Sequence, residues 1–194
     1  RAGHWPAARG HRSRGSGGGR RGLALPGPGE PQGRHRFWLQ LSPWRRPSTA
    51  VAVIVSRLER RNPDSLVSRC KTFAYAGAIQ ALREARAAGA DDALLLGGGG
   101  DLCCGTSANL LVRRRGGWIT PPLASGCLAG VMRGRALALG LAWEGRLSPT
   151  DLLASEGALL INSLGYRAIR RCEGRDLPLA SGAEGLWERL LASS

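Results

Sequence analysis

The sequence predicts a mixed fold of α-helices and β-strands, α/β or α+β, and three observations predict it. A β-branched apolar run at 49–56, TAVAVIVS, has the composition of a buried strand. Residues 68–88 carry apolar side chains at helical spacing. A second apolar run, ALLINS at 158–163, reads as another buried strand. Strands and helices therefore alternate, but irregularly.

Three helices are expected along the chain. The first covers 68–88, buries Ile79, Leu82 and Ala85, and ends at Gly89. The last covers 184–191. The middle one covers 128–142 and would turn three apolar side chains inward: Val131, Leu137 and Leu141.

The remaining strands are expected to be short and separated by polar or glycine-rich turns. RRRGG at 113–117 is most simply a hairpin turn with solvated charges, and ERRNPDS at 59–65 is a polar turn. The strands themselves are predicted at 37–41, 92–96, 108–112 and 118–120.

The first third of the chain is basic and rich in glycine. Residues 1–69 carry a net charge of +11 out of a total of +14, and 1–36 has the composition of a loop. A basic arm can bind nucleic acid, but here every basic residue except one is arginine and aromatic residues are sparse. We therefore expect no nucleic-acid partner.

The cysteines favour a reducing compartment. There are five, no CxxC spacing occurs, and the histidines lie far from them, so neither a disulfide framework nor a zinc site is expected. No apolar run is long enough for a membrane span, and the N-terminus lacks the apolar segment of a signal peptide. The prediction is a cytoplasmic protein without a membrane or metal partner.

Lys71 is the only lysine in the chain, beside 27 arginines. A lysine amine can lose its proton and form a Schiff base with a carbonyl, whereas a guanidinium cannot. Chance survival in an arginine-biased chain is the better explanation of a lone lysine taken by itself, so this residue alone does not indicate a catalytic role.

Several segments, in order, make the sequence resemble the class IV aminotransferase family. They are KTFAYAGAIQALREARAAGADDALLL at 71–96, CCGTSANLLV at 103–112, WITPPLASGCLAGVMRGRALALG at 118–140 and DLLASEGALLINSLG at 151–165. The resemblance implies a pyridoxal-phosphate enzyme of fold type IV, the D-amino-acid aminotransferase-like fold. Residues 37–194 would be its C-terminal, cofactor-binding domain, and 1–36 the remnant of the N-terminal domain and the segment between the two domains.

Within the family, SRGSGG at 13–18, Cys103-Cys104 and NSLG at 162–165 resemble the 4-amino-4-deoxychorismate lyase branch. That resemblance implies release of pyruvate from 4-amino-4-deoxychorismate to leave 4-aminobenzoate, a folate precursor. The alternative on the same scaffold is a branched-chain or D-amino-acid aminotransferase. The family also implies a homodimer.

The resemblance assigns roles residue by residue. Lys71 would bind pyridoxal phosphate covalently and then act as a general base, a role that needs a neutral, desolvated amine. Tyr75 would bond the cofactor's ring oxygen, although a tyrosine on a half-buried helix face is an equal alternative. The phosphate would be held by Gly130, Val131, Met132, Asn162 and Ser163, and the substrate carboxylates would face Arg14 and Arg20.

Two departures from the family pattern change the expectation. Cys104, or Cys103 if the alignment shifts by one residue, stands where the family has a glutamate that bonds the pyridine nitrogen, so the ring should withdraw electrons less strongly. The lyase product becomes aromatic, which drives the elimination, and the thiol therefore favours lyase over aminotransferase. The chain also begins where the family's N-terminal domain ends, so we expect weak or no activity from the chain alone.

Overall fold

The computed structural model describes residues 49–72 and 74–192, and the account below is confined to them. The chain divides into two units, Arg1–Ser42 and Pro43–Ser194. The first unit lies outside the described residues, and so do the glycine- and arginine-rich loop and the strand predicted at 37–41. None of the helices in the described ranges is long and apolar enough to cross a membrane.

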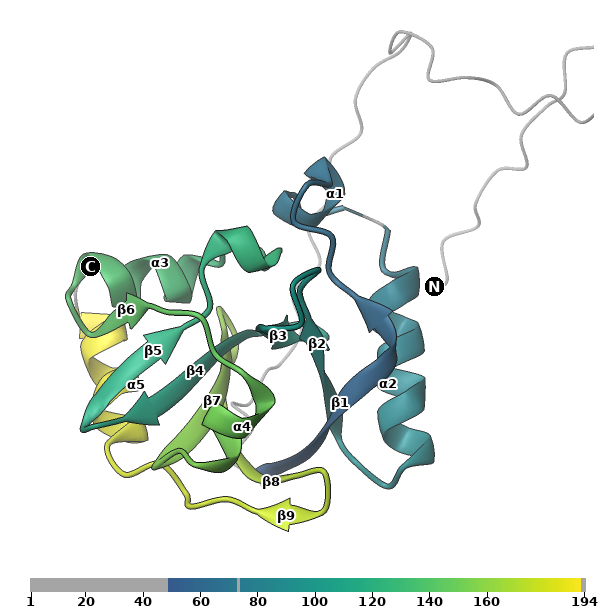
Figure 1. Cartoon of the computed structure of the whole chain (residues 1–194). Coiled ribbons are helices and arrows are strands. Elements are labelled where there is room, and N and C mark those ends of the chain that lie inside the picture. The colour runs from purple at the N-terminus through teal and green to yellow at the C-terminus, as the bar shows by residue number, and fades with distance from the viewer. Residues whose placement is uncertain (1–48, 73, 193–194) are drawn as a thin grey trace, which may run out of the picture. The chain divides into compact units, whose positions relative to one another are not determined.

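Helices and strands are mixed, as the sequence predicts (Figure 1). The strands are β1 (Val51–Arg60), β2 (Asp92–Leu96), β3 (Leu102–Gly105), β4 (Asn109–Arg114), β5 (Gly117–Thr120), β6 (Ala142–Glu144), β7 (Gly157–Asn162), β8 (Gly165–Cys172) and β9 (Arg175–Asp176). The helices are α1 (Leu66–Arg69), α2 (Ala76–Ala87), the 3₁₀ helix η1 (Leu123–Ser125), α3 (Val131–Ala138), α4 (Pro149–Leu153) and α5 (Ala183–Ala192).

The described strands form one sheet in the order β3-β2-β1-β8-β7-β4-β5-β6, with β9 on β8. Because β3 pairs with β4 as well as with β2, the strands β1, β2, β3, β4, β7 and β8 close into a ring. The β3–β4 seam of this ring rests on a single residue pair, Cys104 opposite Asn109. β1 runs parallel to both of its neighbours, β2 and β8, whereas β7 runs antiparallel to both of its neighbours, β4 and β8.

Side chains that alternate along the ring strands fill three apolar clusters. Leu94, Leu110 and Leu160 belong to the cluster within the ring, while their chain neighbours point outward. The outer faces of β4 and β7 are covered by α3 and α5, and those of β1 and β2 by α2 (Figure 1). The sheet is thus covered by helices on two sides, and the strand ends between them remain accessible.

The helix predicted at 68–88 is wrong in its first part. α1 ends at Arg69 and α2 begins at Ala76, with a non-helical link between them. The hydroxyl of Thr72 accepts a hydrogen bond from the Ala74 amide at 3.2 Å, a local turn that competes with helical hydrogen bonding. The end at Gly89, with φ of 72°, is confirmed.

The buried face of α2 also differs from the predicted one. Ala81 and Ala85 are fully buried, but Ile79, expected inside, is 51% exposed. Small residues bring α2 close to the sheet, so the large side chain of Ile79 lies on the outer side. Leu82 is half-buried.

The middle helix is shorter than the predicted 128–142. α3 ends where Gly140 adopts φ of 64°, with Gly140 and Leu141 amides bonded to the Leu137 and Ala136 carbonyls. Leu141 is buried beyond the helix end, whereas Val131, expected inward, is 66% exposed at its start. The face that does pack inward consists of Met132, Arg133 and Ala136.

Most predicted strands are confirmed, and four were missed: β3, β6, β8 and the two-residue β9. β1 extends through Arg60 into the expected turn, β4 runs from Asn109 to Arg114 rather than over 108–112, and β2, β5, β7 and α5 lie where expected. Few residues of β8 are buried, and between them lie Arg167, which is half-buried, and Arg170 and Arg171, which are exposed. These arginines interrupt the apolar pattern by which a strand is recognised in a sequence.

The start of α4 makes the stability of the fold depend on pH. The Asp151 carboxylate accepts hydrogen bonds from the Ser148 amide at 2.8 Å and the Ser148 hydroxyl at 2.7 Å, and Arg114 lies beside it. These bonds, the Ser148 amide first, hold the pKa of Asp151 below its usual value. The resulting stabilisation is present above the unfolded-state pKa, and it is lost as the pH falls through the folded-state pKa.

We therefore expect Asp151→Asn to lower the free energy of unfolding by about 1 kcal/mol at neutral pH. The difference from wild type should shrink below about pH 4, where Asp151 of the wild type becomes protonated. Urea unfolding of both proteins across this range measures the difference. Glu188→Gln, which removes an exposed carboxylate on α5, is the matched control. An unchanged gap between wild type and Asp151→Asn at acid pH would contradict the expectation.

Candidate functional site

One cleft, with a cavity volume of about 370 Å³, lies where the strand ends meet the first turns of α2 and α3. Its lining comes from distant parts of the chain. β1, α1, the link before α2 and α2 itself supply one wall, and β2, β3 and β4 supply residues near the seam of the ring. The segment before α3 and the β7–β8 turn complete it. The ring of strands therefore brings these separate segments to one place.

The structure gathers most of the expected site residues around this cleft. Those that line it are Lys71, Tyr75, Cys104, Gly130, Val131, Asn162 and Ser163. Met132 does not, because it is buried against the outer face of β4 and β7. Arg14 and Arg20 lie outside the described residues.

Lys71 lies on the non-helical link between α1 and α2 and is exposed. The Thr72 turn and the start of α2 at Ala76 hold this link, so the lysine is carried by a short segment and not by a helix as predicted. Its expected role needs a desolvated amine. Since the described residues leave Lys71 exposed, that desolvation has to come from whatever covers the cleft.

Tyr75 and Glu59 lie at the same end of α2. Tyr75 is the N-cap residue of this helix, 44% exposed, and lines the cleft close to the lysine link. Glu59, near the end of β1, packs so closely on the first turn that a Cβ built on Gly77 would lie 2.9 Å from its Oε2. A carboxylate is favourable at a helix N-terminus. Glu59 is the one carboxylate among the described lining residues.

The opposite end of the cleft is formed by the start of α3. Gly130 is the N-cap, no side chain caps the helix, and the first-turn amides of α3 are therefore available to a ligand. A Cβ built on Gly130 would lie 2.1 Å from the Asn109 Oδ1, so this position admits only glycine without a rearrangement. Asn109 also donates to the Leu128 carbonyl at 2.9 Å, which fixes the segment before the helix.

Two turns beside the α3 start are tied together by side-chain hydrogen bonds. Asn162 donates to the Ser107 carbonyl at 3.3 Å and accepts from the Leu164 amide at 2.9 Å. The buried Asp92 accepts from the Thr106 amide at 3.2 Å and the Thr106 hydroxyl at 2.7 Å. Uncapped amides, fixed turns and an obligatory glycine make this end of the cleft suited to an anion such as a phosphate.

Cys104 lies on β3 between these two ends and is 7% exposed. Its cross-strand partner on β2, Leu95, lines the cleft as well. At this position the cleft is therefore lined by a thiol and not by a carboxylate. Among the described residues no group of histidine, cysteine or acidic side chains could hold a metal ion.

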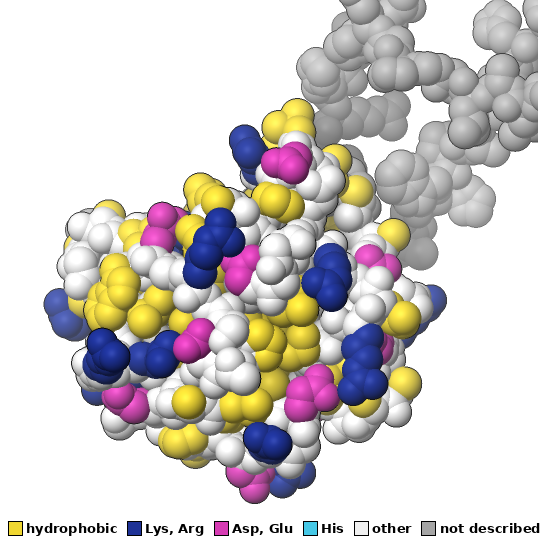
Figure 2. All heavy atoms as spheres, viewed as in Figure 1, with side chains coloured by type: hydrophobic (Ala, Val, Ile, Leu, Met, Phe, Trp, Pro, Cys, Tyr) yellow, Lys and Arg dark blue, Asp and Glu magenta, His cyan; other side chains and the backbone are white. Residues whose placement is uncertain are grey.

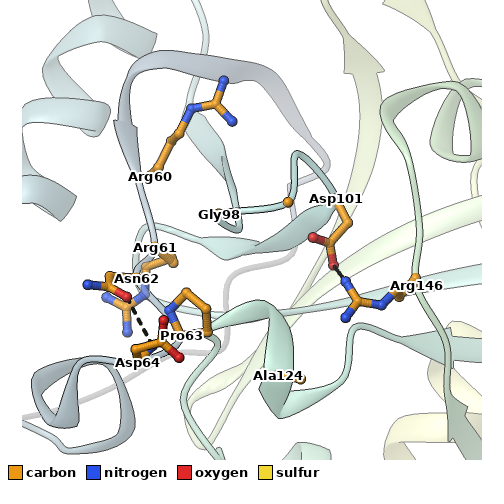
Figure 3. A pocket seen from close by; sticks show the side chains of 10 residues that line it. Arg60, Arg61, Asn62, Pro63, Asp64, Gly98, Asp101, Ala124 and Arg146 are labelled. Atoms are coloured by element: carbon orange, nitrogen blue, oxygen red, sulfur yellow. Dashed lines mark hydrogen bonds and ion pairs between the residues drawn. The ribbon is translucent and has the colours of Figure 1, made fainter.

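A basic pocket of about 520 Å³ adjoins the cleft and shares Arg60 and Arg61 with it (Figure 3). Arg61 is held by the Gly126 carbonyl at 3.0 Å and the Ser68 carbonyl at 2.8 Å. Arg146 reaches the Asp101 carboxylate at 3.4 Å. The Arg60 side chain has no hydrogen-bond or ion-pair partner within the described part of the chain and remains available to an anionic ligand.

Sequence reasoning missed Arg60, Arg61, Glu59 and Asn109. The first three fall in ERRNPDS, whose charges read as a solvated turn, although an adjacent pair of arginines directly after a buried strand was a usable signal. On the face seen in Figure 2, basic and acidic side chains are interspersed around a central apolar area, without a single-sign stretch.

Comparison with known families now identifies the scaffold. Residues 12–172 match the model of amino-transferase class IV. The chain belongs to the class IV aminotransferase family. Pyridoxal phosphate is the cofactor of this family, which accounts for a cleft that combines one lysine with an anion-binding end. No curated protein sequence matches the chain significantly.

Solved structures of class IV aminotransferases and relatives resemble the described domain. A branched-chain aminotransferase from the thermophilic archaeon Thermoproteus uzoniensis is 27% identical, with a TM-score of 0.67 over 74% of this chain and 50% of its own. A Legionella pneumophila protein, provisionally assigned as a 4-amino-4-deoxychorismate lyase, is 24% identical, with a TM-score of 0.72 over 80% of this chain and 60% of its own.

A hypothetical aminotransferase from Mycobacterium tuberculosis, solved with pyridoxal phosphate bound, is 24% identical, with a TM-score of 0.65 over 74% of this chain and 55% of its own. The likenesses at 24% identity show the fold alone. The present chain spans between 50% and 60% of the length of these three proteins.

The cleft fits the cofactor at two ends. The uncapped start of α3 and its obligatory Gly130 suit the phosphate, and Lys71 offers the amine on the opposite wall. Between these ends the lining includes the Cys104 thiol, and Glu59 is the one carboxylate among the described lining residues.

Proposed function

We propose that the chain carries the cofactor-binding half of a pyridoxal-phosphate lyase that converts 4-amino-4-deoxychorismate to 4-aminobenzoate and pyruvate in folate biosynthesis. Its family, its cleft and its single lysine support a pyridoxal-phosphate site. The chain spans about half of the Thermoproteus uzoniensis enzyme, so the activity and substrate of the whole protein are part of this proposal.

In the proposed site the residues that line the cleft have distinct roles. Lys71 supplies the amine that holds the cofactor and afterwards moves a proton at the reacting carbon. The first-turn amides of α3, with Gly130, Val131, Asn162 and Ser163, hold the phosphate, and Tyr75 contacts the ring oxygen. When bound, the cofactor supplies an aldehyde for the substrate amine and a ring that withdraws electrons.

The observation that carries the choice of a lyase is the Cys104 thiol on the cleft wall. A neutral thiol leaves the ring a weaker electron sink than a carboxylate would. Elimination of pyruvate needs less electron withdrawal, because aromatisation of the product drives it. The Arg60 side chain, which has no hydrogen-bond or ion-pair partner among the described residues, would receive a substrate carboxylate. Arg14 and Arg20 stay predictions, because they lie outside the described residues.

The alternative is a branched-chain or D-amino-acid aminotransferase, and Glu59 favours it. The cleft keeps this one carboxylate among its described lining residues, so an acidic partner for the ring remains available on another strand. The relative from Thermoproteus uzoniensis is a branched-chain aminotransferase.

Two further parts of the proposal concern the whole protein. A homodimer is supported by exposed apolar side chains at the cleft, since Val67 is 48% exposed, Val131 66% and Leu164 58%. A cytoplasmic location is supported by the free thiols: all five cysteines are unpaired in the described part of the chain. The protein would act on a small-molecule amine substrate.

A single-turnover assay with the protein in excess over substrate tests the proposal, because slow chemistry is then still detected. We expect pyruvate and 4-aminobenzoate from 4-amino-4-deoxychorismate, and no keto acid from branched-chain or D-amino acids. Cys104→Glu should bring keto-acid formation above the detection limit, because a carboxylate strengthens the electron sink.

Cys104→Ser is the matched control, since it keeps a neutral side chain of similar size and should leave the ratio of products unchanged. If wild type releases keto acid and no pyruvate, the aminotransferase replaces the lyase. If Cys104→Glu loses the cofactor, Cys104 does not face the ring and the argument for a lyase fails.

A further inference from the structure

A buried ion pair joins two strands of the ring close to the cleft without lining it. The Asp92 carboxylate on β2 is 2% exposed and contacts the Arg167 guanidinium on β8, whose side chain is 26% exposed. β2 and β8 lie on either side of β1 (Figure 1). Asp92 is the one carboxylate among the buried residues that the structure describes. The proposed function assigns a role to neither side chain.

The strand register points both side chains into the ring. Asp92 precedes Leu94 by two residues, so the two share a face of β2, and Leu94 belongs to the cluster within the ring. Arg167 lies directly opposite Leu160 of β7, which belongs to the same cluster. Residues opposite one another in an antiparallel pair point to the same side of the sheet. A charged pair therefore stands beside apolar side chains.

The Asp92 carboxylate accepts hydrogen bonds through both of its oxygens. One oxygen accepts from Arg167. The other accepts from the Ala93 amide at 2.8 Å, the Thr106 amide at 3.2 Å and the Thr106 hydroxyl at 2.7 Å. An asparagine has only one acceptor oxygen, so its NH₂ group would face donors on one side or the other. Only a carboxylate therefore binds the guanidinium and Thr106 together.

The β3–β4 turn, residues 106–108, is also held by the β7–β8 turn. The Ser107 carbonyl accepts a hydrogen bond from the Asn162 side chain at 3.3 Å. Asn162 in turn accepts from the Leu164 amide at 2.9 Å, which fixes the β7–β8 turn. A connected path of bonds thus leads from the ion pair through the β3–β4 turn to the β7–β8 turn. Residues of both turns line the cleft.

Stability alone does not account for a charged pair at this place. Removing two charges from water costs free energy, and an apolar pair of similar volume is often as stable or more stable. What an apolar pair lacks is a set of acceptors in a fixed position. The carboxylate offers that set to the β3–β4 turn, and the guanidinium fixes which oxygen faces the turn.

We propose that Asp92 and Arg167 are positioning residues, whose ion pair holds the β3–β4 and β7–β8 turns in the arrangement that receives the cofactor phosphate. The inference rests on the proposed function, because it concerns the same cleft. Neither side chain lines the cleft, so the pair acts on the ligand through Thr106, Ser107 and Asn162.

Thr106→Val tests this path with little disturbance, because it removes the hydroxyl that donates to Asp92 and keeps the side-chain volume. Hydrogen exchange of the cofactor-free chain, read by mass spectrometry, is compared at residues 105–109 and 162–165. We expect exchange to become about fivefold faster in both turns, as for the loss of one hydrogen bond. Thr106→Ser keeps the hydroxyl and should exchange like wild type.

Thr120→Val is the matched control. Thr120 on β5 is 1% exposed, and its hydroxyl donates to the Leu110 carbonyl at 2.9 Å, so the same substitution removes one buried hydrogen bond outside the cleft lining. Its effect on exchange should stay on β4 and β5. In spectroscopic titrations with pyridoxal phosphate, Thr106→Val should raise the dissociation constant by about fivefold or more, and Thr120→Val should leave it unchanged.

Arg167→Met tests the ion pair itself, with Arg170→Met as the control on the same strand. Arg170 lies 4.0 Å from Asp91, whose side chain is 52% exposed, so this second pair is not buried. Arg167→Met should speed exchange in both turns and weaken pyridoxal-phosphate binding by about tenfold or more, and Arg170→Met should change neither. If Arg167→Met does not fold, the Thr106 variants still decide the outcome.

Three results would count against the proposal. Faster exchange in Thr106→Val that is confined to 105–109 would show that the two turns are not connected. Faster exchange in both turns with unchanged affinity, or an equal loss of affinity in Thr120→Val, would remove the positioning role. No binding of pyridoxal phosphate by the wild-type chain would overturn the proposed function, and the exchange data would then still decide whether the ion pair holds the turns.

Discussion

Replacing Lys71 with alanine is expected to abolish the visible absorbance band that the chain acquires with pyridoxal phosphate, and with it all borohydride-stable labelling within the domain. Lys71 is the only lysine in the sequence, and it lines the same cleft as Gly130 at the start of α3. No other side chain of the chain can form the same covalent link, because arginine is not a useful nucleophile. The expected loss of specific labelling is therefore complete.

Lys71→Arg is the matched variant, because it keeps a positive charge and much of the side-chain length. If it also loses the band, covalent capture and not charge is responsible. The α-amino group can react with an aldehyde too, so peptide mapping after reduction must separate label at residue 71 from label at the N-terminus. Undiminished labelling of Lys71→Ala within the domain would remove the chemical basis of the proposed site.

Substituting Gly130 with alanine is expected to disrupt the phosphate end of the cleft. The new Cβ would lie 2.1 Å from the Asn109 Oδ1, far inside van der Waals contact. Asn109 would have to move and give up its 2.9 Å hydrogen bond to the Leu128 carbonyl. We expect the dissociation constant for pyridoxal phosphate to rise by roughly 100-fold and the free energy of unfolding to fall by about 1–3 kcal/mol.

Gly134→Ala is the control on the same helix. A Cβ there meets nothing within 4 Å, and alanine is favoured over glycine in a helix by about 1 kcal/mol, so stability should rise while affinity is unchanged. Spectroscopic titration and thermal unfolding of both variants measure the two quantities. Similar affinities for both variants would mean that the start of α3 does not hold the phosphate.

Much of the fold follows from local sequence, because burial on both faces marks a strand clearly. TAVAVIVS and ALLINS have no polar interruption and became β1 and β7. The same reasoning did not predict β8, because few of its residues are buried and its arginines interrupt the apolar pattern. β3 and β4 are close in sequence, but the ring also needs long-range pairs such as Val53 with Cys172 and Asn109 with Ile161, which a local pattern does not contain.

Site residues could be predicted where their role depends on the type of side chain. They could not be predicted where it depends on packing between residues that are distant in sequence. A unique lysine and a Gly-Val-Met helix start could be selected from the sequence, but Met132 turned out to pack inward behind the start of α3. The need for glycine at position 130 comes from Asn109, which is distant in sequence. Thr72 broke the expected helix through one side-chain bond that propensity does not capture.

The single-pair seam between β3 and β4 has a thermodynamic consequence. Cys104 and Asn109 form that pair, and both line the cleft. The amides there should exchange with solvent through local opening more readily than those of β4 and β7, which share a longer ladder. A ligand that spans the cleft holds the two sides of the seam together. Occupancy and global stability are then linked, so that the domain is most resistant to unfolding and proteolysis when it is loaded.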